Sequence, residues 1–168
     1  MTVRGIDHLP EFERDLDKFV DATDFAKDFI DRHGKTITKE VINQARWGRG
    51  PGGRQFKKYS KQYAARKSSQ GSIWHNWMKS LDEEDRERML DEENFSWVFE
   101  PPNMLALVWT PANEQQAAYG PAHNDGEGKM PKREWMHFEA PQTVVKIDLA
   151  LERVSGNRID SFSAKWGG

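Results

Sequence analysis

Residues 95–109 read Phe-Ser-Trp-Val-Phe-Glu-Pro-Pro-Asn-Met-Leu-Ala-Leu-Val-Trp, and this stretch decides the fold class. In 95–99 the aromatic residues alternate with smaller ones, which is the period of a strand with one buried face, and 104–109 is an apolar run of strand length. Residues 100–103 contain two prolines and join the two runs as a turn. We therefore predict a β-hairpin over 94–110.

The residues before the hairpin have the period of helices. From Leu9-Pro10 onward, apolar residues recur at spacings of three and four, which predicts one long amphipathic helix over 10–33, ended by Gly34. A second helix is expected over about 38–47. Further helical patterns cover about 60–69 and 73–81, and the acidic run 82–93 is most simply a solvated helical face.

The residues after the hairpin begin with a short expected helix over 112–118. Residues 119–138 then predict a shaped loop, rich in glycine and proline, that runs into an apolar anchor around Trp135. Beyond Pro141, residues 142–154 fit either a helix ended by Gly156 or a strand, and the two terminators favour the helix. Residues 157–168 are expected to form a C-terminal arm.

This order of elements predicts an α+β fold, in which N-terminal helices and a C-terminal helix pack on a small antiparallel sheet, with long loops and terminal arms. A length of 168 residues suits a single domain over 1–168. Hydrophobic residues make up 36% and charged residues 31%, which is polar for a globular monomer and indicates surfaces that a partner covers.

The absence of cysteine excludes disulfides and thiolate metal sites. No run of 18 apolar residues is present, and the N-terminus lacks an apolar leader, so we expect a soluble protein that is cytosolic when made and has no membrane partner. The net charge of −2 conceals strong segregation: residues 34–79 carry +10 and residues 80–100 carry −7. Such blocks give opposed faces for a polyanion or for contact between copies.

Catalytic chemistry has weak support in the sequence. His123, Asp125 and His137 are suitable ligands for zinc or iron, but the chain between them is a flexible loop without helical spacing. The carboxylates of 82–93 are numerous enough for a Mg²⁺ nuclease, although such runs are usually solvated. The Lys-Ser/Thr ending of a phosphate loop and a Gly-x-Ser-x-Gly elbow are both missing. We therefore expect no enzyme, no metal and no cofactor.

The basic segment 46–67 is the strongest electrostatic feature, and it begins with a Gly/Pro loop over 46–58. Its arginines, lysines and aromatic residues suit either nucleic acid or an acidic protein surface. The candidate contacts to DNA or a partner are Arg46, Arg49, Arg54, Lys57 and Lys58. The candidate interface residues are Trp47, Tyr59, Tyr63, Arg133 and Trp135, with Trp135 expected in the core and Arg133 directed at an acidic partner.

Three motifs carry a resemblance to a known family. They are Trp47-Gly-Arg-Gly-Pro-Gly-Gly-Arg-Gln-Phe56, then Tyr59-Ser-Lys-Gln-Tyr-Ala-Ala-Arg-Lys67, then the stretch from Tyr119 through Gly126 to Met130-Pro-Lys-Arg-Glu-Trp135. Together they resemble the virion morphogenesis or tail completion proteins of tailed bacteriophages, over about residues 10–140. The chain departs from the family pattern at Gly120-Pro121 and in the acidic block after Leu81.

This resemblance implies a non-enzymatic structural protein of the virion neck, which forms a homo-oligomeric ring and joins head to tail during virion assembly. Its implied partners are further copies of itself, the head connector and portal-side proteins, the tail terminator or tail tube protein, and the genomic double-stranded DNA in the channel. Two alternatives stay open: a nucleic-acid-binding module that uses residues 46–67, and a metal-dependent hydrolase that uses the two histidines and the aspartate named above.

Overall fold

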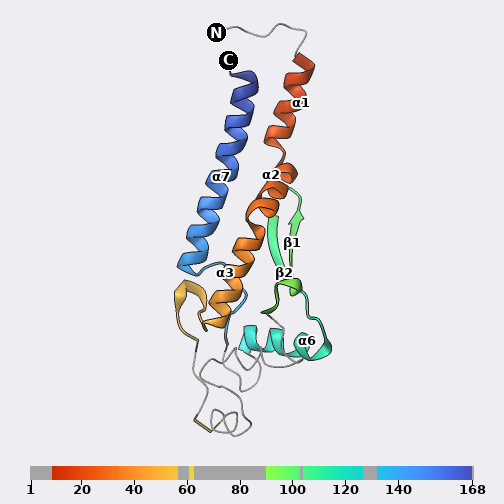
Figure 1. The fold of residues 1–168 in the computed structure, drawn as a ribbon. Coiled ribbons are helices and arrows are strands. Elements are labelled where there is room, and N and C mark those ends of the chain that lie inside the picture. The colour runs from red at the N-terminus through yellow and green to blue at the C-terminus, as the bar shows by residue number, and fades with distance from the viewer. Residues whose placement is uncertain (1–8, 57–60, 63–89, 103, 127–131, 168) are drawn as a thin grey trace. The chain divides into compact units, whose positions relative to one another are not determined.

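A computed structural model describes residues 9–56, 61–62, 90–102, 104–126 and 132–167 of the chain (Figure 1). The chain length suits one domain, and the contacts within it form two compact units. The first unit comprises residues 1–35, 97–106 and 146–168, and the second comprises residues 36–96 and 107–145. The expected helices over 60–69 and 73–81 and most of the acidic run lie outside the described residues.

The elements confirm an α+β fold with a two-stranded antiparallel sheet. Among the described residues, the α-helices with printed bounds are α1 Leu9–Val20, α2 Ala22–Phe29, α3 Lys35–Arg46, α6 Glu114–Pro121 and α7 Pro141–Trp166. The strands are β1 Phe95–Glu100 and β2 Met104–Trp109, so the expected hairpin is confirmed. Short turns of other helix types are η2 Ile30–Gly34, η3 Pro51–Gly53, η5 Glu92–Asn94 and η6 Ala122–Gly126.

The expected single helix over 10–33 is wrong at two points. It is interrupted at Asp21, whose Oδ1 accepts hydrogen bonds from the backbone N–H groups of Thr23 at 2.7 Å and Asp24 at 3.0 Å and so caps α2. These bonds, from Asp24 first, lower the pKa of Asp21. Gly34 does not end the helix either, because the chain continues through the π-helix η2 into α3. A Cβ on Gly34 would lie 3.0 Å from Nε1 of Trp97, so this glycine serves packing.

The expected C-terminal arm is also wrong, whereas the helix favoured for 142–154 is confirmed. α7 passes through Gly156 and continues to Trp166, and it lies beside α1 in the first unit (Figure 1). The ring of Phe162 packs 5.7 Å from Phe12 and 5.0 Å from Phe19, and Trp166 meets Phe12 edge to face at 5.3 Å. This aromatic contact stabilises the last turns, which the sequence alone would leave free.

Arg158 joins α7 to the break between α1 and α2. Its Nη2 donates to the backbone carbonyls of Lys18 and Phe19, the latter at 2.8 Å, and its Nη1 lies 3.5 Å from Oδ2 of Asp28. A planar guanidinium suits this task because it satisfies several acceptors at a helix end together. Arg158 therefore holds the interrupted N-terminal helices against α7.

Lys165 forms an ion-pair cluster with two carboxylates near the other end of the same helices. Its Nζ lies 2.5 Å from Oδ2 of Asp15 and 2.7 Å from Oε1 of Glu11. The hydrogen bond from Lys165 is the largest cause that lowers the pKa of Asp15 and the pKa of Glu11 below their ordinary values of 3.8 and 4.5. The same bonds, from Asp15 first and Glu11 second, raise the pKa of Lys165 above 10.5.

These directions predict how acid acts on the first unit. A carboxyl group with a lowered pKa in the folded state stabilises the fold above its unfolded pKa, and this contribution disappears as pH falls through the folded pKa. We therefore expect the melting temperature to fall as the pH drops below 4.5, the ordinary value of Glu11. Asp15→Asn should make that fall shallower. The melting temperatures of the wild type and the Asp15→Asn variant are measured by circular dichroism over a series of acidic buffers. If the melting temperature falls equally steeply with pH in both proteins, Asp15 does not contribute to the acid dependence.

The second unit is built around Trp135. Its core cluster is Ile42, Ala45, Leu90 and Trp135, and the half-buried side chains that pack on it are Phe56, Phe95, Trp109 and Met136. Trp135 is 1% exposed, which confirms the predicted anchor. Its Nε1 donates to the carbonyl of Gly120 at 3.1 Å, and its ring meets Trp109 edge to face at 5.3 Å. The expected loop over 119–138 is thus partly wrong, because α6 and η6 make residues up to 126 helical, whereas 132–138 are irregular and 127–131 lie outside the described residues.

Candidate interaction surface

The glycine loop, residues 47–56, follows directly after α3 and is a formed turn. Gly48, Gly52 and Gly53 have φ angles of 67°, 66° and 75°, which other L-residues rarely adopt. The backbone N–H of Gly50 donates to the carbonyl of Arg54 at 2.8 Å, and that of Phe56 donates to the carbonyl of Gly48 at 2.7 Å. The irregular loop predicted over 46–58 is confirmed for 47–56, where its backbone bonds close it on itself, whereas Arg46 is the last residue of α3 and 57–58 lie outside the described residues.

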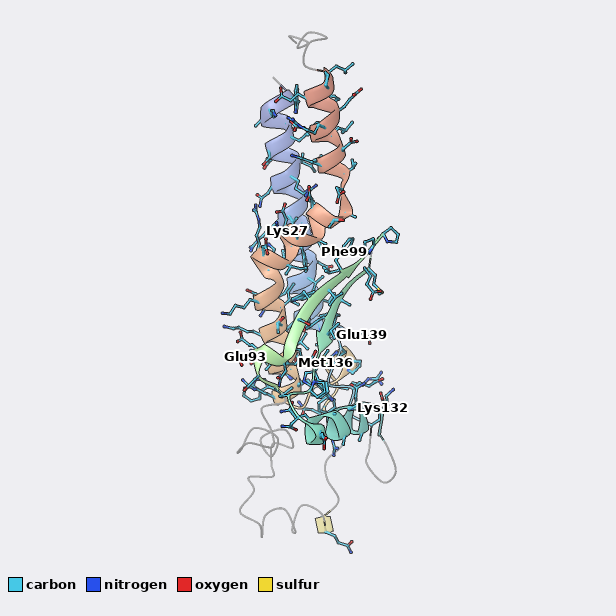
Figure 2. All side chains as sticks on the ribbon, turned by 90° about the vertical axis from the view of Figure 1, so that its right-hand side faces the viewer. Lys27, Glu93, Phe99, Lys132, Met136 and Glu139 are labelled. Atoms are coloured by element: carbon cyan, nitrogen blue, oxygen red, sulfur yellow. The ribbon has the colours of Figure 1, made fainter. Side chains whose placement is uncertain are left out.

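A second set of bonds fixes the loop to the segment that contains Trp135. Nε2 of His137 donates to the carbonyl of Arg49 at 3.2 Å, and the backbone N–H of Gly52 donates to the carbonyl of Glu139 at 3.1 Å. A Cβ on Gly53 would touch Pro141 at 3.4 Å. Figure 2 marks the segment by the side chains of Met136 and Glu139. These contacts join the loop to the segment that carries Trp135 in the core of the second unit.

The predicted contact residues differ in exposure. Trp47 is 70% exposed, Arg54 is exposed, and Arg46 and Arg49 are half-buried. Leaving a tryptophan ring exposed to water costs free energy, since the ring is mostly apolar surface. The loop thus brings together an exposed aromatic ring and guanidinium groups. Lys57, Lys58, Tyr59 and Tyr63 lie outside the described residues.

The prediction that Arg133 is directed at a partner is wrong. Its side chain is 0% exposed and lies inside the second unit, two residues before the equally buried Trp135. Arg133 and Trp135 are therefore internal structural residues and cannot form a surface for another molecule without unfolding.

The described residues do not form a metal site from the three candidate ligands. His137 is engaged with the loop carbonyl, and Asp125 is exposed and accepts a hydrogen bond from Nδ2 of Asn124 at 3.0 Å. The side chain of His123 is outside the description. Within the described residues, no three histidine or carboxylate side chains stand close enough to hold a metal ion.

A groove in the first unit could not be predicted from local patterns, because its walls come from residues far apart along the chain. It measures about 300 Å³, and its charged lining includes Asp15, Asp28, Arg158 and Lys165. All four of these side chains are engaged in the ion pairs described above. The groove is therefore a seam between helices that is closed by charge pairs.

No protein-family model, curated protein or solved structure matches the chain. Of the three motifs quoted in the sequence analysis, the first coincides with the glycine loop. Among the helices described in Figure 1, none is long and apolar enough to cross a membrane.

Proposed function

We propose that the chain is a structural subunit of a tailed-phage neck, a tail completion protein that assembles as a ring between head connector and tail. The observation that carries this proposal is the preformed glycine loop with Trp47 exposed at its start and Arg54 exposed at its end. Tryptophan and arginine are the residues most enriched among the energetically important positions of protein interfaces. A loop that is ordered before binding loses less entropy when the partner arrives.

The charge blocks support the same proposal. A ring of identical subunits needs an interface in which one face meets a different face of the next copy. The block of +10 in residues 34–79 and the block of −7 in residues 80–100 supply opposite signs for such contacts. The glycine loop lies in the basic block, so its partner in this proposal is an acidic protein surface.

Removal of the gene from the phage tests the function. Heads filled with DNA and separate tails should accumulate, and purified chain added to that extract should restore infectious particles. Trp47→Ala should reduce the restored titre about tenfold or more, because a central interface tryptophan contributes at least 1.4 kcal/mol. Val20→Ala is the matched control, since Val20 is 67% exposed and lies outside the loop. Normal joining of heads and tails without the chain would overturn the proposal.

The same +10 block favours nucleic-acid binding as the second candidate function. DNA binding by the purified chain at several salt concentrations separates the two. If the loop holds phosphates, the affinity falls steeply with salt, and joint replacement of Arg49, Arg54, Lys57 and Lys58 by serine flattens that dependence. If the wild type and the serine variant bind DNA equally at low salt, the loop is assigned to a protein partner.

A further inference from the structure

The glycine loop is a small antiparallel ladder whose centre is the pair of Arg49 and Gln55. The two backbone hydrogen bonds described above, donated by Gly50 and by Phe56, lie on either side of this pair. In an antiparallel ladder, the residues between two hydrogen-bonded pairs turn their N–H and C=O groups away from the partner strand. The backbone of Arg49 therefore presents both of its polar groups at the outer edge of the loop.

Both of these outward groups are engaged. The N–H of Arg49 donates to the carbonyl of Gln44, in the last turn of α3, at 2.9 Å. The carbonyl of Arg49 accepts a hydrogen bond from Nε2 of His137 at 3.2 Å. The centre of the ladder is thus held along its outer edge by the helix before it and by one side chain that lies 88 residues further along the chain.

His137 forms no other hydrogen bond within the described part of the chain. Nδ1 of its ring is buried and has no hydrogen-bond partner there. A buried nitrogen without a partner costs free energy, so the bond from Nε2 to the loop is the polar contact that this ring offers. The residue follows two positions after Trp135, whose ring belongs to the core cluster of the second unit. The core therefore fixes the backbone from which the imidazole reaches the loop.

We propose that His137 is the positioning residue of the glycine loop: its imidazole holds the carbonyl of Arg49 and thereby sets how Trp47 and Arg54 meet a partner. Trp47 lies two residues before Arg49, and Arg54 is the neighbour of Gln55, so both exposed side chains start from the held pair. The loop contains four glycines, which lose more conformational freedom on ordering than other residues. A contact that orders them before the partner arrives strengthens binding. This inference rests on the proposed function, in which the loop meets a partner.

Amide hydrogen exchange tests the positioning without any partner. His137→Ala removes the donor, and the amides of Gly50 and Phe56, which close the ladder, should exchange about twofold to tenfold faster, the range that one neutral hydrogen bond gives. The amides of Ile42 and Ala45 in the core cluster should change less. His137→Gln, whose side-chain N–H replaces that of Nε2, should return the loop amides to within about twofold of the wild type. Equal acceleration of loop and core, or no recovery with glutamine, would overturn the proposal.

The head–tail joining experiment tests the link to the partner. His137→Ala should lower the restored titre about twofold to tenfold, and His137→Gln should keep it near that of the wild type. In a chain that already carries Trp47→Ala, His137→Ala should cause no further loss, because both substitutions act through the same loop. A further loss of equal size would place the action of His137 outside the loop and overturn the proposal.

The failure of this inference and the failure of the neck proposal give different results. If Trp47→Ala lowers the titre and His137→Ala does not, the loop is the interface and the role of His137 alone is overturned. If heads and tails join normally without the chain, the neck proposal is overturned, and the exchange experiment still decides whether His137 positions the loop.

Discussion

Replacement of Trp135 by alanine should lower the free energy of unfolding by about 3–5 kcal/mol. The ring is 1% exposed, and it meets the ring of Phe95 at 6.5 Å and that of Trp109 at 5.3 Å, both edge to face. Its loss opens a cavity between these side chains and leaves the carbonyl of Gly120 without its hydrogen bond from Nε1. Urea denaturation followed by circular dichroism at 222 nm measures the change.

Trp47→Ala is the matched control for this experiment. It removes the same side chain at a position that is 70% exposed, so the free energy of unfolding should change by less than about 0.5 kcal/mol. Trp135→Phe should fall between the two, because it keeps most of the buried area and loses only the hydrogen bond and part of the ring. Equal losses for the two alanine variants would show that Trp135 is not the core of the second unit.

Gly120→Ala should lower the free energy of unfolding by about 1–3 kcal/mol, although alanine is the better helix former. The new Cβ would lie 2.5 Å from Cη2 and Cζ3 of Trp109. That ring has little freedom to move aside, since it stands perpendicular to Trp135. The added methyl group must therefore displace α6 or the tryptophan pair.

Gly156→Ala is the control for this experiment. It is the same substitution within a helix, but at a position with open space around it. Here the propensity effect acts alone, and the protein should become more stable by about 0.5–1 kcal/mol. The two substitutions should have opposite signs in the same urea experiment. A gain in stability from both would mean that Trp109 yields, and the packing reason for Gly120 would be wrong.

The hairpin and the buried anchor could be predicted from the sequence, because both depend on local patterns. The alternation in 95–99 and the apolar run in 104–109 set the period of the two strands. The helix ends could not be predicted as well. Glycine commonly ends a helix, but Gly34 and Gly156 both lie inside helices. At Gly34 the ring of Trp97, more than 60 residues later in the chain, decides the outcome. Local propensity is a weak guide where such packing acts.

The candidate interaction surface could likewise be predicted only in part from the sequence. Its glycines predict an irregular loop, but its fixed conformation comes from bonds to His137 and Glu139, which no local pattern indicates. For Arg133, the spacing along the sequence did indicate that the side chain is buried. In an extended chain, residues 133 and 135 point to the same side, so a buried Trp135 implies a buried Arg133. Arginine often binds the carboxylates of a partner, but at this position the spacing from Trp135 decides.

The π-helix η2 accommodates one residue more than an ordinary helical turn would. Phe29 and Gly34 are five residues apart, and both touch the ring of Trp97. In a regular α-helix, residues five apart are rotated by about 140° and cannot share one neighbour, whereas the wider i→i+5 turn brings them to the same side. Deletion of one residue from 30–34 would give an ordinary helix in which the two positions are four residues apart, about 40° around the axis, so both could still face Trp97. Homologous chains should therefore tolerate a one-residue deletion within this turn more readily than an insertion.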